Sequence, residues 1–509
     1  MLSAGGCNKR QPSPQPRPAT AAAAPPIFLA PLTPAERQEL YHLPEGGELI
    51  PLDVLRAVQS VRTFRPFMED LGRFRMIEDP DDPDGLPVGI SVARVNGQRT
   101  LPRQVFLNCS ACHSARITYQ GRSLQVDGAP AHFDAVAFIV ELLQSLDSTL
   151  ADPQRLAAFL KRLTSLQKAQ LPADAAQLKQ QADTALESLR LLRAKLAYIQ
   201  NLRGLRPTTQ PGFGRLDAFV AARDLLFGEK HAIDVNSPVS LPPVFGLAKL
   251  RWYHYDNNTN SILQRNIGQS LGVGAVADMK SFSSTVEVRS LLRLEELVRR
   301  IPTPKWPTEI LGKLDAVRQS RGAILYRTHC ASCHDYGPDG SFPDQVVDLK
   351  TVGTDPNRAV NFARPVGEKP FASALGEVLA EVERRGFERE HVTPQEAAQM
   401  EPPQVVWRTN LGYSSRPIDG VWATAPYLHN GSVPTLYELL LPPAQRPRTF
   451  LTGSREYDPK KVGYVTDGAA GATFLFDTAA DGNHNTGHTW GTELTDEQRW
   501  DLVEYLKGR

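Results

Sequence analysis

Apolar residues recur at helical spacing in several stretches of the chain. Residues 134–147 predict an apolar helix, and two further helical segments follow between residues 152 and 201. The break between those two segments falls at Leu171-Pro172, because a proline removes a helical hydrogen bond. We predict that the two segments form a helical hairpin inserted at about residues 152–203. One face of the second segment carries an aliphatic stripe that indicates core packing, made of Leu189, Leu192, Leu196 and Ile199.

Capping residues mark helices near both ends of the chain. Thr33 precedes Pro34, which is the pattern of an N-cap residue followed by proline in the first helical turn. Near the other end, Thr495 and Gln498 have the spacing of a capping box and open an apolar and aromatic helix. We expect this last helix to pack against an amphipathic helix at residues 314–327.

The remaining sequence is less regular. Residues 85–127 mix glycine, proline and β-branched residues, which predicts loops or short strands. Together with the helices, this pattern predicts a mainly α fold with long loops. A chain of 509 residues is long enough for two domains, which we place at residues 27–313 and 314–509.

Two Cys-x-x-Cys-His pentapeptides, at residues 109–113 and 330–334, carry the chemistry. Each has the form of the attachment site of a c-type haem. The two cysteines form thioethers to the haem, and the histidine that follows supplies the proximal nitrogen to the iron. The residues with these roles are Cys109, Cys112 and His113 in the first motif and Cys330, Cys333 and His334 in the second.

A paired Cys-x-x-Cys sequence is also the pattern of a structural zinc site. A zinc site would leave unexplained why a histidine directly follows each pair. We therefore predict two covalently bound haem c groups and two cytochrome c-like domains. The first motif falls in the irregular stretch, so we place it on a loop or short strand. The second follows the helix at residues 314–327, which is how a small cytochrome c domain begins.

Composition narrows the class of protein. The formal net charge is +1 with interspersed signs, which argues against nucleic acid as a partner. No apolar run approaches the roughly 18 residues needed to span a bilayer. Four of the five cysteines belong to the haem motifs, so no pair remains for a disulfide. Haem c is attached outside the cytoplasm, and we therefore expect a periplasmic or secreted protein.

The first 26 residues raise the question of how the chain is exported. Met1 to Cys7 lack the charged and apolar regions of a secretion signal. We expect the printed start to lie inside the real signal peptide, and the small residues before Cys7 then resemble the lipobox of a bacterial lipoprotein. Residues 8–26, rich in Pro and Ala, would be the tether of that lipid anchor. The alternative is a free cysteine in a disordered tail, and the sequence leaves both open.

The ligand on the far side of each iron determines the function. A His/Met pair gives a higher-potential electron carrier, and a second histidine generally lowers the potential. An empty position binds oxygen, peroxide or another small ligand. Met400 lies at a plausible distance after His334, and Met279 is remote from His113. An isolated methionine is more often a gap filler than a ligand.

Histidines are better candidates for the second haem. His484 and His488 lie four residues apart in a Gly/Asn-rich loop that leads into the last helix, and His429 lies in another loop. Any of the three can supply an imidazole to the second iron, so they remain alternatives alongside Met400. For the first haem the residues alone give no convincing sixth ligand. The aromatic and amide-rich residues 251–260 either roof a haem, with Trp252 relaying electrons, or form an aromatic corner of the core.

Several stretches together resemble a known family. The chain is similar to the dihaem cytochrome c peroxidase and MauG superfamily, and within it most similar to the rubber oxygenase-like branch, which includes fatty-acid dioxygenases. The long Trp-Ala-Thr-Ala-Pro-Tyr-Leu-His-Asn-Gly stretch is the most specific of the matches. The matching stretches are residues 109–113, 128–130, 212–219, 252–268, 330–334, 420–436 and 487–492.

The resemblance implies roles for individual residues. The first haem, on His113, would have an open distal face, and the second would be six-coordinate with His488 as its distal histidine. Trp252 matches an aromatic residue that couples the two haems. Ile267 would lie near the distal pocket of the first haem, beside Asn266, and we take these two and Trp252 as catalytic candidates. An apolar Ile267 favours oxygen, because a peroxidase needs an acid–base group over the iron.

The resemblance therefore implies an oxidoreductase. Oxygen or peroxide would react at the first haem, an apolar organic substrate would be oxidised beside it, and the second haem would carry electrons, with a periplasmic redox partner. The alternatives are a non-catalytic dihaem electron carrier, a dihaem cytochrome c peroxidase, and a haem-based ligand sensor.

Overall fold

Helices and short strands alternate along the chain in the computed structural model, which describes residues 25–48, 50–93, 103–170 and 207–509 and the single positions 180, 183 and 187. Helices account for 41% and strands for 14% of the protein, so the fold is mixed, and the expectation of a mainly α fold is corrected. The physical reason lies largely in residues 85–127, whose β-branched residues pair into strands around the first haem motif.

Two small sheets flank the first motif. One has the order β2-β4-β3 and the other the order β1-β6-β5. Within the second sheet, β5 and β6 pair in antiparallel register from Ser114 opposite Asp127 to Tyr119 opposite Arg122. The strands are β1 (Ile27–Phe28), β2 (Ile50–Pro51), β3 (Ile90–Ala93), β4 (Gln104–Leu107), β5 (Ser114–Tyr119) and β6 (Arg122–Asp127).

The helices of the first half agree with most of the sequence pattern. Helix α1 (Pro34–His42) has Thr33 as its N-cap, as the sequence predicts, and Glu36 completes a capping box there. Helix α4 (Ala135–Ala151) extends four residues beyond the predicted end. Helix α5 (Pro153–Gln170) is the first arm of the predicted hairpin. The second arm, with its aliphatic stripe, and the tether with Cys7 lie outside the described residues.

Helices α8 (Ile262–Gly272) and α9 (Val288–Arg299) form the wall opposite the first motif. Helix α8 also packs against α15 (Phe371–Glu390), a long helix of the second half. The other elements of the first half are α2 (Leu52–Ala57), η1 (Phe67–Phe74), β7 (Arg215–Leu216), α7 (Ala218–Phe227), η4 (Glu229–His231), β8 (Val239–Ser240), η5 (Leu247–Lys249) and α10 (Thr308–Leu311).

The second motif directly follows one of two helices that cross closely. Helix α11 (Ala316–His329) leads into α12 (Ala331–His334), and α18 (Asp496–Lys507) packs on α11, as the sequence predicts. The crossing depends on Gly322, because a Cβ atom there would lie 2.1 Å from the carbonyl oxygen of Asp501. The Thr495 capping box is present as well.

The rest of the second half consists of short elements in long loops. They are β9 (Val346–Asp348), α13 (Leu349–Val352), α14 (Asn357–Ala363), α16 (Pro394–Ala398), β10 (Gly412–Ser414), η6 (Val421–Ala423), α17 (Leu436–Leu439), η7 (Pro443–Gln445), β11 (Thr449–Thr452), β12 (Tyr457–Asp458), β13 (Gly463–Tyr464) and β14 (Phe474–Asp477).

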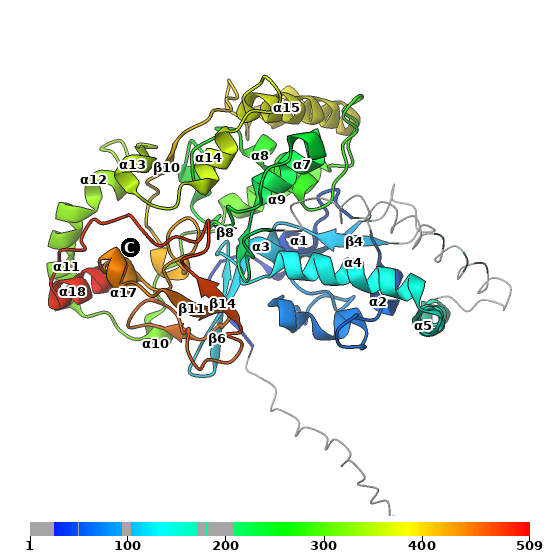
Figure 1. Ribbon diagram of the computed structural model, residues 1–509, viewed down its shortest axis with the longest axis horizontal. Coiled ribbons are helices and arrows are strands. Elements are labelled where there is room, and N and C mark those ends of the chain that lie inside the picture. Colours follow the sequence, from blue (N-terminus) through cyan, green and yellow to red (C-terminus); the bar gives the residue numbers. More distant parts are fainter. Residues whose placement is uncertain are drawn as a thin grey trace, which may run out of the picture.

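The two halves share one hydrophobic core. A single cluster of buried residues runs from Leu32 and Ile117 in the first half to Trp422 and Leu502 in the second. In Figure 1, α11, α12 and α18 lie together at one end of the molecule and α2, α4 and α5 at the other. The predicted domain boundary near residue 314 stays a prediction. Within the described part of the chain, no helix has the length and apolar character needed to cross a membrane.

Candidate haem sites

The first motif forms one turn of helix between two strands. Helix α3 (Ser110–His113) follows β4 and runs directly into β5, so the prediction of a loop or short strand holds only for its flanks. The turn brings the side chains of Cys109 and His113 to the same pocket. The Nδ1 atom of His113 donates to the carbonyl oxygen of Pro242 at 2.9 Å. Histidines that bind metals commonly make such a bond, because it fixes the ring and leaves Nε2 for the metal.

Helix α1 covers this motif. The Ser110 hydroxyl donates to the carbonyl oxygen of Leu40 at 2.6 Å, and the amide of Asn108 donates to the carbonyl oxygen of Leu43 at 3.1 Å. Ser110, Ala111 and His113 are only 2%, 6% and 7% exposed. The first motif is therefore built into the interior.

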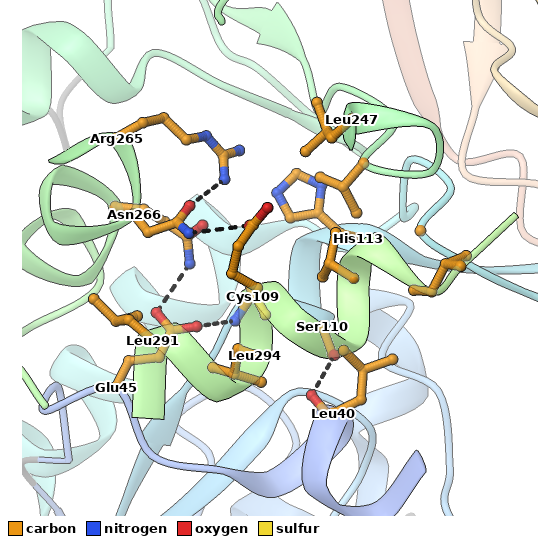
Figure 2. A pocket seen from close by; sticks show the side chains of 16 residues that line it. Leu40, Glu45, Cys109, Ser110, His113, Leu247, Arg265, Asn266, Leu291 and Leu294 are labelled. Carbon is orange, nitrogen blue, oxygen red and sulfur yellow. Dashed lines mark hydrogen bonds between the residues drawn. The ribbon is translucent and has the colours of Figure 1, made fainter. Parts of the chain in front are cut away.

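Charged and polar side chains line the pocket in front of His113. Figure 2 shows Arg265 and Asn266 facing the pocket from α8 and Glu45 lying beside Cys109. Arg265 donates to the Asn266 amide oxygen at 2.7 Å, and Glu45 accepts the backbone N–H of Cys109 at 2.7 Å. Glu295 of α9 completes this polar wall. Apolar side chains make up much of the remaining lining, among them Leu40, Val244, Leu247, Leu291, Leu294 and Val298.

Burial sets the protonation of these groups. It raises the pKa of Glu45 to about 7 and raises the pKa of Glu295, because a buried carboxylate loses its hydration. Burial, reinforced by the positive charge of Arg265, lowers the pKa of His113 to about 3. The His113 imidazole is therefore neutral at physiological pH, which is the form that binds a metal.

The two catalytic candidates from α8 are placed differently. Asn266 lines the pocket, in agreement with the sequence-based interpretation. Ile267 is 0% exposed and packs in the shared hydrophobic core, whereas its neighbours Arg265, Asn266 and Gln269 line the pocket. Consecutive helical positions point in different directions, so the pocket wall is polar at the place where the resemblance implied an apolar residue.

The second motif has a different setting. Helix α12 contains no buried residue, and its Ser332 is exposed. The Nδ1 atom of His334 donates to the carbonyl oxygen of Arg416 at 2.6 Å, the same arrangement as in the first motif. Burial lowers the pKa of His334 as well, so this imidazole is also neutral.

His488 faces His334. The centroids of the two rings lie 6.3 Å apart, at an interplanar angle of 45°. Two imidazoles that share one metal ion, each at a metal–nitrogen distance of about 2 Å, place their centroids roughly 6 Å apart. The buried Nδ1 atom of His488 has no hydrogen-bond partner among the described residues, and burial lowers the pKa of this histidine to about 4. The donor set at this site therefore fits a haem iron held between two neutral imidazoles.

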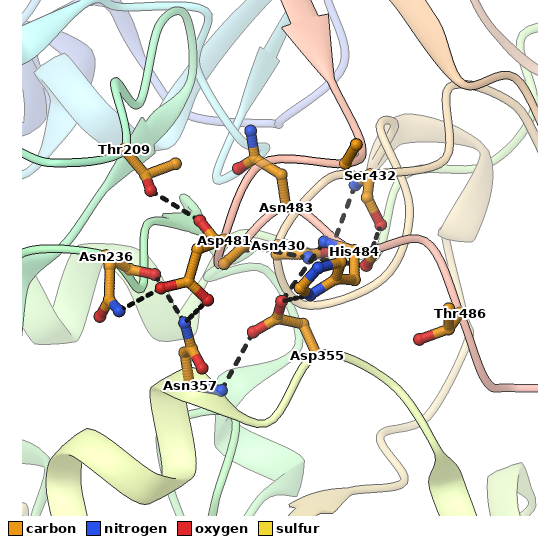
Figure 3. A network of polar contacts seen from close by, with 12 residues as sticks. Thr209, Asn236, Asp355, Asn357, Asn430, Ser432, Asp481, Asn483, His484 and Thr486 are labelled. Carbon is orange, nitrogen blue, oxygen red and sulfur yellow. Dashed lines mark hydrogen bonds and ion pairs between the residues drawn. The ribbon is translucent and has the colours of Figure 1, made fainter.

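The other sixth-ligand candidates are engaged elsewhere. The Nδ1 atom of His484 lies 2.7 Å from a carboxylate oxygen of Asp355, within the polar network shown in Figure 3. The His429 ring stacks on Tyr413 with a centroid distance of 3.9 Å. Met400 precedes Glu401, whose carboxylate accepts the backbone N–H of Leu263 at 2.7 Å, which places this segment against α8.

Trp252 and Tyr255 differ in whether they contact the segments that hold His113 and His334. The Trp252 ring lies under the guanidinium of Arg408, 3.3 Å from its central carbon. The Tyr255 hydroxyl donates to the carbonyl oxygen of Ser240 at 3.1 Å, two residues before the Pro242 that holds His113.

On its other side, the Tyr255 ring lies 5.5 Å from the guanidinium carbon of Arg416, whose own carbonyl oxygen holds His334. Tyr255 thus lies on a contact route between the two sites. Tyr255 belongs to the aromatic segment 251–260 named from the sequence, and the coupling role of Trp252 stays a prediction.

Comparison with known proteins identifies the family. Residues 412–451 match the family described as RoxA-like, cytochrome c-like. The uncharacterized protein y4iJ of Sinorhizobium fredii (strain NBRC 101917 / NGR234) is 31% identical over 558 aligned positions, which cover 93% of this chain and 91% of y4iJ. This chain belongs to the y4iJ family. The uncharacterized protein y4iM of the same organism is 29% identical over 53% of this chain and 64% of its own length.

The RoxA-like match bears on the second site. The matched segment contains Arg416, which holds His334, and the loop of His429. The match gives this chain a cytochrome c-like domain, which implies that it binds haem c. The match supports a RoxA-like cytochrome family for this chain. Membership of the wider dihaem peroxidase and MauG superfamily stays a prediction.

Proposed function

We propose that the chain is a dihaem c-type oxidoreductase. Oxygen or peroxide would be activated at the first haem, on His113, and electrons would pass through the second, on His334 and His488. An apolar organic substrate would be oxidised beside the first haem. Export to the periplasm, a redox partner there and lipid anchoring through Cys7 belong to the same proposal.

The proposal rests on a difference between the two sites in the number of histidines that can bind an iron. His334 has a second imidazole, that of His488, at a distance suited to a shared metal. Among the described residues that line the first pocket, His113 is the one histidine, and methionine is absent. An iron bound by His113 would therefore keep a position for a small ligand, whereas an iron between His334 and His488 would not.

The haem would supply ligand binding and electron storage. The residues around it hold the proximal imidazoles, exclude water and present polar groups. Pro242 and Arg416 hold the proximal imidazoles through their carbonyl oxygens, which keeps each Nε2 directed at its site. The leucines and Val244 exclude water on the apolar side of the first pocket. Arg265 and Asn266 present hydrogen-bond donors to it, and Glu295 adds a carboxyl group whose pKa is raised by burial.

A dihaem cytochrome c peroxidase is the second candidate, and the polar wall of the first pocket favours it. Cleavage of peroxide needs an acid–base group and a positive charge near the ligand. Glu295 and Arg265 are residues of those types in that pocket. The apolar Ile267, on which the preference for oxygen rested, packs in the core instead.

Spectroscopy of the holoprotein tests the proposal. EPR and optical spectra, recorded before and after addition of cyanide, should show one haem that changes with the ligand and one low-spin haem that does not. If both haems are low-spin and indifferent to cyanide in both oxidation states, the chain is an electron carrier. If one haem does bind cyanide, turnover with oxygen or peroxide and an apolar substrate separates the two enzymatic candidates.

A further inference from the structure

Arg446 is a buried arginine whose hydrogen bonds all go to backbone carbonyl oxygens. It follows η7, is 5% exposed and lies within the RoxA-like segment. A guanidinium has five N–H donors. All five are used, on the carbonyl oxygens of Leu439, Leu441, Asn485, Gly487 and His488, at 3.1, 3.1, 2.6, 2.9 and 3.0 Å.

These five bonds join two segments. Two acceptors lie at the end of α17, and three lie in the loop that carries His488. The loop has a costly backbone at His488, whose φ angle is 44°, whereas the glycine before it adopts its φ angle of 70° without steric cost. Such a conformation persists only where the surroundings hold it. Arg446 holds the loop from the side of α17.

The opposite side of the loop is held by the end of α13. The backbone N–H of His488 donates to the carbonyl oxygen of Val352 at 2.8 Å. A Cβ atom on Gly487 would lie 2.2 Å from the carbonyl carbon of Gly353, so the two backbones are in direct contact. The backbone of His488 is thus fixed between Val352 and Arg446, which leaves its ring little freedom apart from rotation of the side chain.

The chemistry of the contact requires arginine. Burial lowers the pKa of Arg446 to about 10, so the group stays charged at neutral pH. A lysine carries three donors on one point charge and cannot reach five carbonyl oxygens on two segments at once. Glutamine offers two donors and no charge.

We propose that Arg446 is a positioning residue that holds the His488 imidazole opposite His334, an inference that rests on the proposed function. The test compares Arg446→Lys and Arg446→Gln holoproteins with the wild type. We expect part of the second haem to change from low to high spin and to become accessible to cyanide, and its midpoint potential to rise, because a second histidine lowers the potential. The first haem should bind cyanide as before.

Arg223 offers a matched control. It is 3% exposed and also donates to backbone carbonyl oxygens, those of His231, Arg364 and Pro365. Arg223→Lys should lower the thermal stability without altering the spectrum of the second haem. If Arg446→Gln does not yield holoprotein, Arg446→Lys, which keeps the charge, gives the same readout.

The outcomes distinguish the positioning role of Arg446 from the ligand role of His488. An unchanged second haem in the Arg446 variants, together with a changed one in His488→Ala, overturns the positioning role alone. An unchanged second haem in His488→Ala overturns the ligand assignment on which it rests. A loss of low-spin signal in Arg223→Lys equal to that in Arg446→Lys would make the effect a general loss of stability and would also overturn the positioning role.

Discussion

The two Cys-x-x-Cys-His motifs have the same local chemistry and opposite surroundings. The first lies inside the protein under α1, and its pocket is lined by Glu45, Arg265 and Glu295. The second lies on a helix without buried residues, and its partner across the site is a second imidazole. On the proposed function, the pentapeptide would specify attachment, and segments far away in sequence would decide whether the iron is open or closed.

The difference also separates two tasks. A small ligand that is to be activated needs a site shielded from solvent, with groups that donate protons and charge. An electron carrier needs a fixed ligand set and a position near the surface. On the proposed function, the first site would perform the first task and the second site the second.

Removing the second imidazole would abolish the asymmetry and has the largest expected effect. In His488→Ala, the second haem should change completely from low to high spin and bind cyanide, because its distal position becomes empty. EPR and optical spectra measure this change. His484→Ala is the matched control from the same loop and should leave the spectrum unchanged, since His484 pairs with Asp355. The opposite result would exchange the roles of the two histidines.

A bulkier residue at the helix crossing should weaken the second site alone. Gly322→Ala inserts a Cβ atom 2.1 Å from the carbonyl oxygen of Asp501 and forces α11 and α18 apart. We expect a loss of about 1–3 kcal/mol in the free energy of unfolding. Thermal unfolding followed at the absorbance of each haem measures it. Gly72→Ala, where nothing lies within 4 Å of the new atom, is the control. Equal loss at both haems would show that the halves unfold as one unit.

Electron exchange between the sites tests which aromatic residue connects them. Tyr255→Leu should slow the exchange more than Trp252→Leu, because Tyr255 contacts both segments that hold the proximal histidines. Rapid reduction followed by optical spectroscopy of each haem gives the rate. A larger effect from Trp252→Leu would restore the role that the family resemblance gives to that tryptophan.

The smallest expected effect concerns pH. Burial raises the pKa of Glu295, so the side chain stays protonated and neutral to a higher pH than an ordinary carboxyl group. Above that pKa its negative charge would oppose an anionic ligand. Cyanide affinity at the first haem should therefore fall as the pH rises through the pKa of Glu295. In Glu295→Gln this inflection should disappear, and its persistence would assign it to another group, such as Glu45.

Local signals in the sequence were sufficient for the haem motifs and for the helices around the second one. Thr33 is an N-cap and Thr495 forms a capping box, as predicted, because a cap depends on four neighbouring residues. The composition of the first pocket was not accessible in the same way. Which of Arg265 and Ile267 faces it depends on how α8 packs against α9, a tertiary contact between segments about 25 residues apart.

The roles of Tyr255 and Arg446 were hidden for a related reason. Each acts through carbonyl oxygens of remote segments. Every residue, proline included, has such an oxygen, so no residue pattern marks the acceptor. The ring that faces His334, by contrast, was among the named candidates, because histidine is a distinctive ligand and few were available.

The hydrogen bond from Ser110 to Leu40 has a consequence for the order in which the molecule is assembled. Covalent attachment needs the thiols of Cys109 and Cys112 to meet the vinyl groups of a bulky porphyrin. Once α1 has docked on the first motif, these bonds narrow that approach. On the proposed function, we therefore expect the first porphyrin to be attached before α1 docks. The second motif lies near the surface, so attachment there does not have to precede folding.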